Sequence, residues 1–250
     1  MQLVEMTWPA VAALSKDTPV AIPIAALEQH GHHLPVFTDS MLVGEITRRA
    51  ERQLHDRVLF APVMWLGNSE HHLDFPGTIS ASPRGYLDLL VDMIENFITH
   101  GFKRIVLVNG HGGNNVPGQQ AVFEVRQRHR QREDLLLLFA CYWALGSQPH
   151  ESDPSLVQHA MGHACEWETS MILSLAPHLV GDYQNATTVD PSGTFDPVYR
   201  GWTTKDRSAI GHIGKPSAAS AAKGEALLKI FTADVVTLLE RMLDWNGRTW

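Results

Sequence analysis

A carboxylate and an imidazole stand two residues apart near the start of the chain, where their chemistry could bind a metal. Glu28 is followed by His30, and Asp39 lies just beyond two further histidines. The run before them, residues 19–26, is small and apolar, which predicts a buried strand. Carboxylates and imidazoles are ligands that Zn, Mn or Fe bind in catalytic sites. We expect this segment to supply half of a metal site.

Three further polar clusters follow later predicted strands or open a later helix. Carboxyl ends of parallel strands meet at one edge of a sheet, where α/β proteins place their ligands. We therefore expect these clusters to lie beside the first one. They are Glu70, His71 and His72 in a turn-rich loop, His111 within the Gly-His-Gly-Gly-Asn run at 110–114, and His163, Glu166 and Glu168.

Each cluster taken alone also has a simpler interpretation. A His-rich turn is more often a solvated turn than a metal site. The run at 110–114 precedes a predicted helix, so its backbone amides could cradle a phosphate, although it lacks the Lys-Ser/Thr of a P-loop. Glu166 and Glu168 would be solvated helix charges, and Cys165 a small core residue. The four clusters together favour a catalytic metal centre, in which two ions lower the pKa of water and polarise a carbonyl.

The elements that must position these clusters alternate between strand and helix. Strands that are apolar on both faces are typical of a parallel sheet covered by helices. The alternation predicts a three-layer α/β/α fold with a mostly parallel central sheet. We expect strands at 19–26, 57–63, 104–109 and 134–139, and helices at 39–52 with Asp39 as N-cap, at 82–100 ended by Gly101, and at 117–130.

The second half of the chain is less regular. Residues 147–159 form a polar connection, followed by predicted helices at 166–175 and 218–245. Between these helices, residues 181–216 are rich in Asp, Thr, Ser, Gly and Pro, which predicts ordered loops or short strands. A long irregular segment inside a compact domain is more often functional than idle.

Composition narrows the class of protein. The chain has 250 residues, 44% hydrophobic and 19% charged, with a net charge of −7, which predicts one globular domain over residues 1–250. A negative charge argues against a nucleic-acid partner. Two cysteines, Cys141 and Cys165, indicate a reducing compartment. With no signal peptide and no apolar run long enough for a membrane, we expect a cytoplasmic protein.

Four motifs, in this order, resemble those of the creatininase family. They are residues 27–35 with Thr38-Asp39, residues 72–78, residues 109–114 and residues 163–170. Residues 214–216 and 221–225 are similar to the C-terminal part of that family, so the resemblance covers nearly the whole chain. It implies a three-layer α/β/α fold, often a homohexamer, and a binuclear metal centre that hydrolyses C–N bonds of amides.

The resemblance also implies a ligand set for two divalent ions per chain, either Zn, Mn or Fe. It puts Glu28 and His111 on one ion, His30 on the other, and Asp39 between both. Creatininase has a further Glu ligand two residues after the matched His111, where this chain has Gly113. We expect Glu168 to replace it.

Two neighbours of Glu168 are the catalytic candidates. Glu166 is the second choice for the metal ligand. If Glu168 is the ligand, we expect Glu166 to be catalytic together with His163. His163 matches a His that lies near the substrate in creatininase. We expect it to pass a proton to the leaving nitrogen, because the unperturbed pKa of a His is about 6.5, near neutral pH.

Substrate contacts are expected from residues around these motifs. Creatininase closes a Trp over creatinine from the position that matches His159, whereas Trp143 matches a second aromatic of that pocket. The His argues against creatinine as the substrate. Other family members deformylate a ribosylaminopyrimidine phosphate or trim a peptide in mycofactocin maturation. The expected contacts are Ser69, His72, Asn109, Gly112, Gly113, Trp143 and His159.

The sequence thus predicts a metal-dependent hydrolase of a small, open or cyclic, amide or formamide. Two other functions stay open. One is a non-catalytic binder of a small molecule or nucleotide, with an anion cradled at residues 110–114. The other is a phosphoesterase that uses the same metal centre on phosphorus.

Overall fold

The computed structural model describes residues 1–190, 195 and 198–248. In this part of the chain, four strands form one sheet in the order β2-β1-β3-β4, and every pairing is parallel. The chain leaves β1 toward β2 and then returns to place β3 on the other side of β1. The strands are β1 (Val20–Ile24), β2 (Leu59–Phe60), β3 (Arg104–Asn109) and β4 (Leu136–Cys141).

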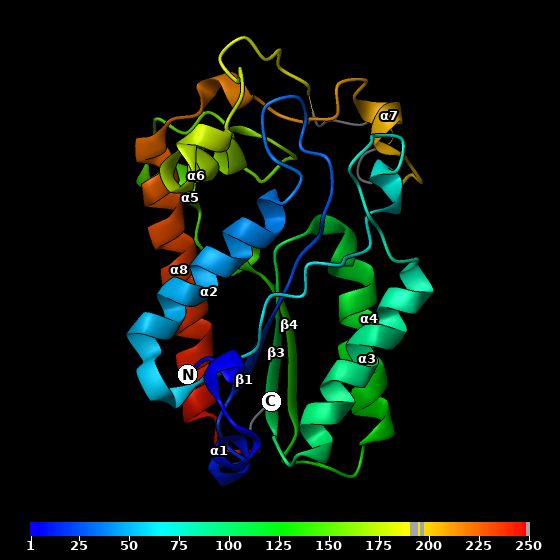
Figure 1. Ribbon diagram of the computed structural model, residues 1–250, viewed down its shortest axis with the longest axis vertical. Coiled ribbons are helices and arrows are strands. Elements are labelled where there is room, and N and C mark those ends of the chain that lie inside the picture. Colours follow the sequence, from blue (N-terminus) through cyan, green and yellow to red (C-terminus); the bar gives the residue numbers. More distant parts are fainter. Residues whose placement is uncertain (191–194, 196–197, 249–250) are drawn as a thin grey trace.

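Helices cover both faces of this sheet, which confirms the predicted three-layer α/β/α fold (Figure 1). One layer consists of α2 (Thr38–Leu54), α6 (Glu166–Leu175) and α8 (Ala221–Asp244), and these helices contact one another. The other layer consists of α3 (Pro83–Thr99) and α4 (Asn115–Arg128), which also pack together.

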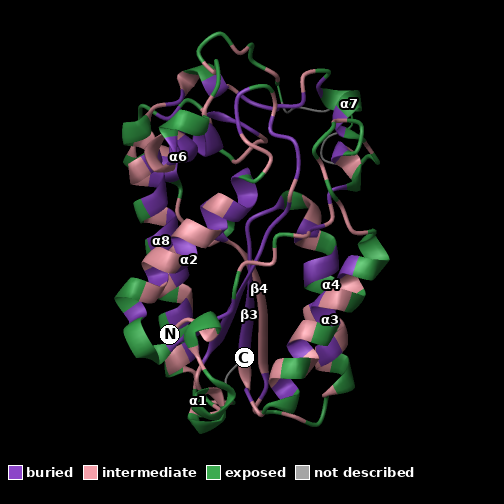
Figure 2. Cartoon of the chain, viewed as in Figure 1, coloured by how far each residue is buried: buried purple, intermediate pink, exposed green. Residues whose placement is uncertain are grey.

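The two central strands, β1 and β3, contribute side chains to two separate apolar cores, one on each face of the sheet. Side chains alternate along a strand, so odd and even positions face opposite layers. Figure 2 shows these strands buried between the helices. Ala21, Val106 and Val108 pack toward α2, α6 and α8, whereas Val20, Ile22, Ile24, Ile105 and Leu107 pack toward α3 and α4. This explains why β1 and β3 are apolar at both parities.

The outer strands differ from the sequence expectation. β4 was expected to be buried on both faces, but all six of its residues are only half-buried. It lies at one edge of the sheet, whereas β2, at the other edge, is buried and pairs with residues 1–2. β2 is two residues long instead of seven. Leu59 N and Ala61 N donate to β1, whereas the next donor to β1 is Met64 N, which bonds Pro23 O at 2.9 Å and breaks the alternation; Ala25 N then donates to Met64 O at 2.9 Å.

Most helix boundaries follow local chemistry. The Ser82 side chain caps α3 by accepting from Gly85 N, and Gly101 after its end has a φ of +94°. The helix predicted at 166–175 is confirmed. Asp39 was expected to be the N-cap of α2, and that expectation was wrong: Phe37 holds the cap position, and the Asp39 carboxylate lies against two imidazoles.

Short helices complete the described chain: α1 (Trp8–Ala13), α5 (Pro149–Ser152) and α7 (Thr204–Arg207). α7 lies in the segment 181–216 that was expected to be irregular; residues 191–194 and 196–197 of that segment fall outside the described residues. No helix in the described ranges is long and apolar enough to cross a membrane.

The close packing of α8 on α6 can be tested at a glycine. A Cβ on Gly224 would press into the main chain of Ser170, whereas a Cβ on Gly44, in α2, would only touch the Val63 side chain at 3.4 Å. Both Gly→Ala changes gain about 1 kcal/mol of helix propensity. We expect Gly224→Ala to lower the free energy of unfolding by about 1–3 kcal/mol because of overpacking. Gly44→Ala, the matched control, should be neutral or stabilising in urea titrations.

Candidate metal centre

Five of the predicted ligands meet at the carboxyl edge of the sheet. Glu28 and His30 lie on the chain beyond β1, and His111 follows β3 by two residues. Asp39 and Glu168 stand in the first turns of α2 and α6. All five side chains are buried. The strand order reverses between β1 and β3, and such a switch point is where open α/β sheets bind ligands.

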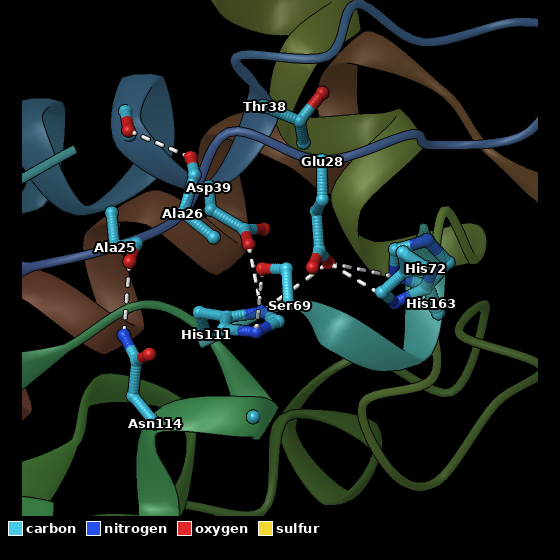
Figure 3. A network of polar contacts seen from close by, with 12 residues as sticks. Ala25, Ala26, Glu28, Thr38, Asp39, Ser69, His72, His111, Asn114 and His163 are labelled. Carbon is cyan, nitrogen blue, oxygen red and sulfur yellow. Dashed lines mark hydrogen bonds and ion pairs between the residues drawn. The ribbon is translucent and has the colours of Figure 1, made fainter. Parts of the chain in front are cut away.

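The Asp39 carboxylate lies at the middle of this group and faces two imidazoles with different oxygens. Its Oδ1 is 3.1 Å from His30 Nε2, and its Oδ2 is 3.1 Å from His111 Nδ1. Glu28 Oε1 is 3.2 Å from the same His111 Nδ1 (Figure 3). Glu168 Oε1 is 3.8 Å from His30 Nε2. The group therefore has two halves that share Asp39.

Backbone carbonyls orient both imidazoles. A carbonyl oxygen only accepts, so the ring nitrogen beside it carries the proton. His111 Nε2 donates to Asn68 O at 3.0 Å, and His30 Nδ1 donates to Glu28 O at 3.1 Å. The opposite nitrogen of each ring faces the carboxylates and can hold a proton or a metal. Metal-ligating histidines are commonly oriented in this way.

Three buried carboxylates close together need positive charge, and each has an oxygen without a hydrogen bond. These atoms are Glu28 Oε2, Asp39 Oδ2 and Glu168 Oε2. Asp39 Oδ2 is close to His111 Nδ1, but the two atoms are not aligned as a hydrogen bond. A buried polar group left unpaired costs about 1–3 kcal/mol, and more when it is charged. Cations bound in this cluster would compensate these oxygens, so the residues fit a metal.

The possible ligand atoms form overlapping sets, which gives room for more than one ion. In each set, one ligand atom per residue lies within 4.8 Å of the others. All are nitrogen or oxygen donors, which suits Zn, Mn or Fe. Among the described residues, the sets are Glu28 with His72 and His163, Glu28 with His71 and His111, His30 with His163 and Glu168, and Glu28 with His30 and Asp39.

The charged groups of the cluster shift the pKa values of one another. Burial lowers the pKa of His111, but Glu28 and Asp39 outweigh burial and raise that pKa to about 10. The pKa of His30 is likewise raised, against burial, by Asp39 and Glu168. Burial would raise the pKa of Asp39, yet His30 and His111 hold it well below its usual range. The site thus draws cations, whether protons or metals.

Two further imidazoles lie on the other side of Glu28. His72 Nε2 is 3.4 Å and His163 Nδ1 is 3.5 Å from Glu28 Oε1 (Figure 3). Burial, followed by the proximity of His30, lowers the pKa of His163 to about 3. Burial and the neighbouring imidazoles also lower the pKa of His72, far below its usual range. Both rings are therefore neutral at pH 7.

Several residues expected to bind substrate also shape the loop that carries His111. Asn109 Nδ2 donates to His111 O at 2.6 Å, and Asn109 Oδ1 accepts from His111 N at 3.1 Å. Ser69 Oγ lies 3.2 Å from His111 Nε2. A Cβ on Gly112 would meet nothing within 4 Å, whereas one on Gly113 would press on Asn68 O and His111 Nε2.

Three other predicted site residues do not reach the cluster. Glu166 is buried, but its carboxylate accepts from Lys223 Nζ at 2.6 Å and from the main-chain N–H groups of residues 157 and 158. Trp143 packs against the core beside Tyr142. His159 is exposed and stacks on His150 with ring centroids 4.3 Å apart.

The structure also adds residues to which the sequence gave no specific role. His71, expected only as a member of the second cluster, stacks on His111 with ring centroids 5.6 Å apart and meets the Trp202 ring at 5.0 Å. Gln29 Nε2 lies 2.8 Å and Thr204 Oγ1 2.9 Å from His72 Nδ1. Gln29 could have been found from the sequence, because it stands between two candidate ligands, Glu28 and His30. Nothing local pointed to Thr204, which lies 132 residues from His72.

Comparisons with known proteins assign the chain to a family. The family model named Creatininase, described as creatinine amidohydrolase, matches residues 4–239. This chain belongs to the creatininase family. The mycofactocin precursor peptide peptidase of Mycobacterium ulcerans is 29% identical over 94% of this chain and 86% of its own length. The creatinine amidohydrolase of Pseudomonas putida is 27% identical over 90% of this chain and 91% of its own.

Solved structures of creatininase share the whole fold. One crystal structure of creatinine amidohydrolase superposes with a TM-score of 0.84 at 25% identity, covering 98% of both chains. Two others, each with a TM-score of 0.83, are a mutant of Zn–Zn type at 26% identity and a Mn form at 25%. They cover 98% of this chain and 98% and 99% of their own. The chain is therefore a hydrolase of the creatininase family whose substrate these likenesses do not assign.

Gly113 stands where the family resemblance implied a further Glu ligand, and it offers a test. A side chain there would intrude on the hydrogen bond from His111 Nε2 to Asn68 O, so this backbone does not accommodate a Glu at that position. We expect Gly113→Ala to weaken zinc affinity about 10- to 100-fold, as loss of a ligand-orienting contact does. Gly112→Ala is the matched control and should keep wild-type affinity in a chelator-competition titration. Equal affinity in both variants would contradict this account.

Proposed function

We propose that the protein is a metal-dependent amidohydrolase with a binuclear centre. The observation that carries the proposal is the set of three buried carboxylates, each with an unbonded oxygen, facing imidazole nitrogens at the switch point of the sheet. The Zn–Zn and Mn forms of creatininase support two divalent ions of such a kind.

Each half of the cluster would hold one ion. Glu28 and His111 would hold the first, His30 and Glu168 the second, and Asp39, whose two oxygens face His30 and His111, would serve both. When bound, two divalent ions lower the pKa of a water molecule and polarise a scissile carbonyl. Glu168 takes the second-metal position because Glu166 is already paired with Lys223 on the far side of α6.

His163 is the group that we assign to proton transfer. Its Nε2 lies 2.8 Å from Gln29 O, so Nε2 carries the proton and Nδ1 is bare toward Glu28. A bare nitrogen can accept the proton of the attacking water and then donate it to the leaving nitrogen of the amide. The pKa of His163, about 3, keeps the ring neutral before the reaction begins, but it also makes Nδ1 a weaker base than the ordinary imidazole expected from the sequence.

We propose a small amide, formamide or short peptide as substrate rather than creatinine. The position that holds a substrate-covering Trp in creatininase is His159 here, which lies on the surface against His150. The similarity to a peptidase that acts on a mycofactocin precursor peptide supports the inclusion of peptides. Ser69, His72, Asn109 and the glycines before Asn114 would border the reacting group.

We also propose a cellular location, a domain organisation and an oligomeric state for the protein. Two free cysteines support a reducing, cytoplasmic location. The family match over residues 4–239 supports one domain for the whole chain. We propose a homo-oligomer by family resemblance, which light scattering on the purified protein would measure.

The activity can be tested on a panel of cyclic amides, formamides, short peptides and phosphate esters. We expect at least one C–N substrate to be hydrolysed, the activity to be lost with EDTA, and zinc or manganese to restore it. Asp39→Ala should abolish turnover because Asp39 serves both halves of the site. Full metal content and full activity in Asp39→Ala would refute the mechanism.

The same panel separates the two rival functions. Hydrolysis of phosphate esters alone would make the protein a phosphoesterase. A non-catalytic binder would hydrolyse nothing, and its ligand affinity would survive chelation. In that case the backbone amides at residues 110–114 would bind an anion without the metal.

The assignment of the second metal can be tested within α6. We expect Glu168→Gln to reduce bound zinc from two ions to one per chain in elemental analysis, because Gln is a weaker metal ligand than a carboxylate. Glu166→Gln is the control: zinc should stay at two, while loss of the buried pair with Lys223 should lower the free energy of unfolding by about 3 kcal/mol. The reverse pattern would exchange the roles of the two residues.

A further inference from the structure

Gln29 stands between the imidazoles of His72 and His163, and the residue is 5% exposed. Its Oε1 accepts from Gly31 N at 2.8 Å, and its Nε2 donates to Gly211 O at 2.9 Å. Gly31 N can only donate and Gly211 O can only accept. The orientation of the Gln29 carboxamide is therefore determined by its partners.

The two protons on Gln29 Nε2 can be assigned one by one. One goes to Gly211 O. Two imidazole nitrogens compete for the other: His72 Nδ1 at 2.8 Å and His163 Nε2 at 3.0 Å. His163 Nε2 already donates to Gln29 O at 2.8 Å, so it has no lone pair to offer. The second proton must go to His72 Nδ1.

This assignment gives the two rings opposite roles. Because His72 Nδ1 accepts, its proton is on Nε2, which points at Glu28 Oε1. His72 is thus a donor to Glu28 and offers no lone pair to the cluster. His163 is the reverse, with a bare Nδ1 at the same oxygen. The Thr204 hydroxyl, 2.9 Å from His72 Nδ1, can donate or accept and does not decide the tautomer.

The segment 204–211 in turn holds Gln29 in place. Gly211 has a φ of +90°, and a Cβ there would collide with the Gln29 carboxamide. Gly211 O and Thr204 Oγ1 therefore reach Gln29 and His72 from a part of the chain more than 130 residues away in sequence.

We propose that Gln29 is a positioning residue that determines which nitrogen of His72 and of His163 carries the proton. It keeps His72 from binding metal and leaves His163 able to take up a proton. The catalytic half of this inference rests on the proposed hydrolase function. The tautomers themselves do not.

The experiment is ¹⁵N NMR of histidine-labelled, zinc-loaded protein, in which protonated and bare ring nitrogens have distinct shifts. We expect His72 and His163 both to be protonated on Nε2. In Gln29→Glu the carboxylate can only accept, so the His72 proton should move to Nδ1. Thr204→Val is the matched control and should leave both tautomers unchanged. A wild-type His72 protonated on Nδ1, or a tautomer unmoved in Gln29→Glu, would overturn the inference.

Kinetics supply the second readout. We expect kcat of Gln29→Glu to fall about 10- to 100-fold with little change in KM, as for loss of a contact that orients a site histidine. Gln29→Met keeps the shape but can neither donate nor accept, so a merely structural role would give both variants equal losses and the same tautomers. If Gln29→Glu does not fold, the wild-type spectrum still tests whether His72 and His163 are protonated on Nε2. Correct tautomers without any hydrolysis would refute the proposed function alone.

Discussion

The constraint on which this structure depends is the burial of three carboxylates within one small volume. Glu28, Asp39 and Glu168 lie together away from solvent, and each keeps an oxygen without a hydrogen bond. Such an arrangement is costly unless cations neutralise it. Protons on His30 and His111 can do so in part, which is why the pKa of both rings is raised. Divalent metals would neutralise the same negative charge and would also bind the oxygens that have no hydrogen bond.

The fold supplies this cluster from elements that could not meet locally. The chains beyond β1 and β3 bring Glu28, His30 and His111 together, and the first turns of α2 and α6 add Asp39 and Glu168. Close contacts keep these elements in register, because Gly224 lets α8 touch the main chain of α6, and Gly113 leaves space for the His111–Asn68 hydrogen bond. Small residues at such crossings make the rigidity of the site possible.

The imidazoles around the carboxylates differ in role because their partners differ. His30 and His111 each donate one proton to a carbonyl and turn the other nitrogen to the cluster. His72 receives a hydrogen bond from Gln29 and turns a proton to Glu28. Histidine thus provides two candidate metal ligands, His30 and His111, one donor, His72, and one acceptor, His163. The tautomer, set by backbone and amide partners, separates these functions.

Local patterns were enough for the order of the elements, the parallel sheet and the types of ligand, because periodicity and strand-end motifs are properties of neighbouring residues. They could not choose between Glu166 and Glu168, since residues two apart on a helix face different sides. Only the packing of α6 on α8, which pairs Glu166 with Lys223, turned Glu168 toward His30. The hold of Gly211 on Gln29 was likewise decided by a tertiary contact, because it joins residues 182 positions apart in the chain, which no local pattern encodes.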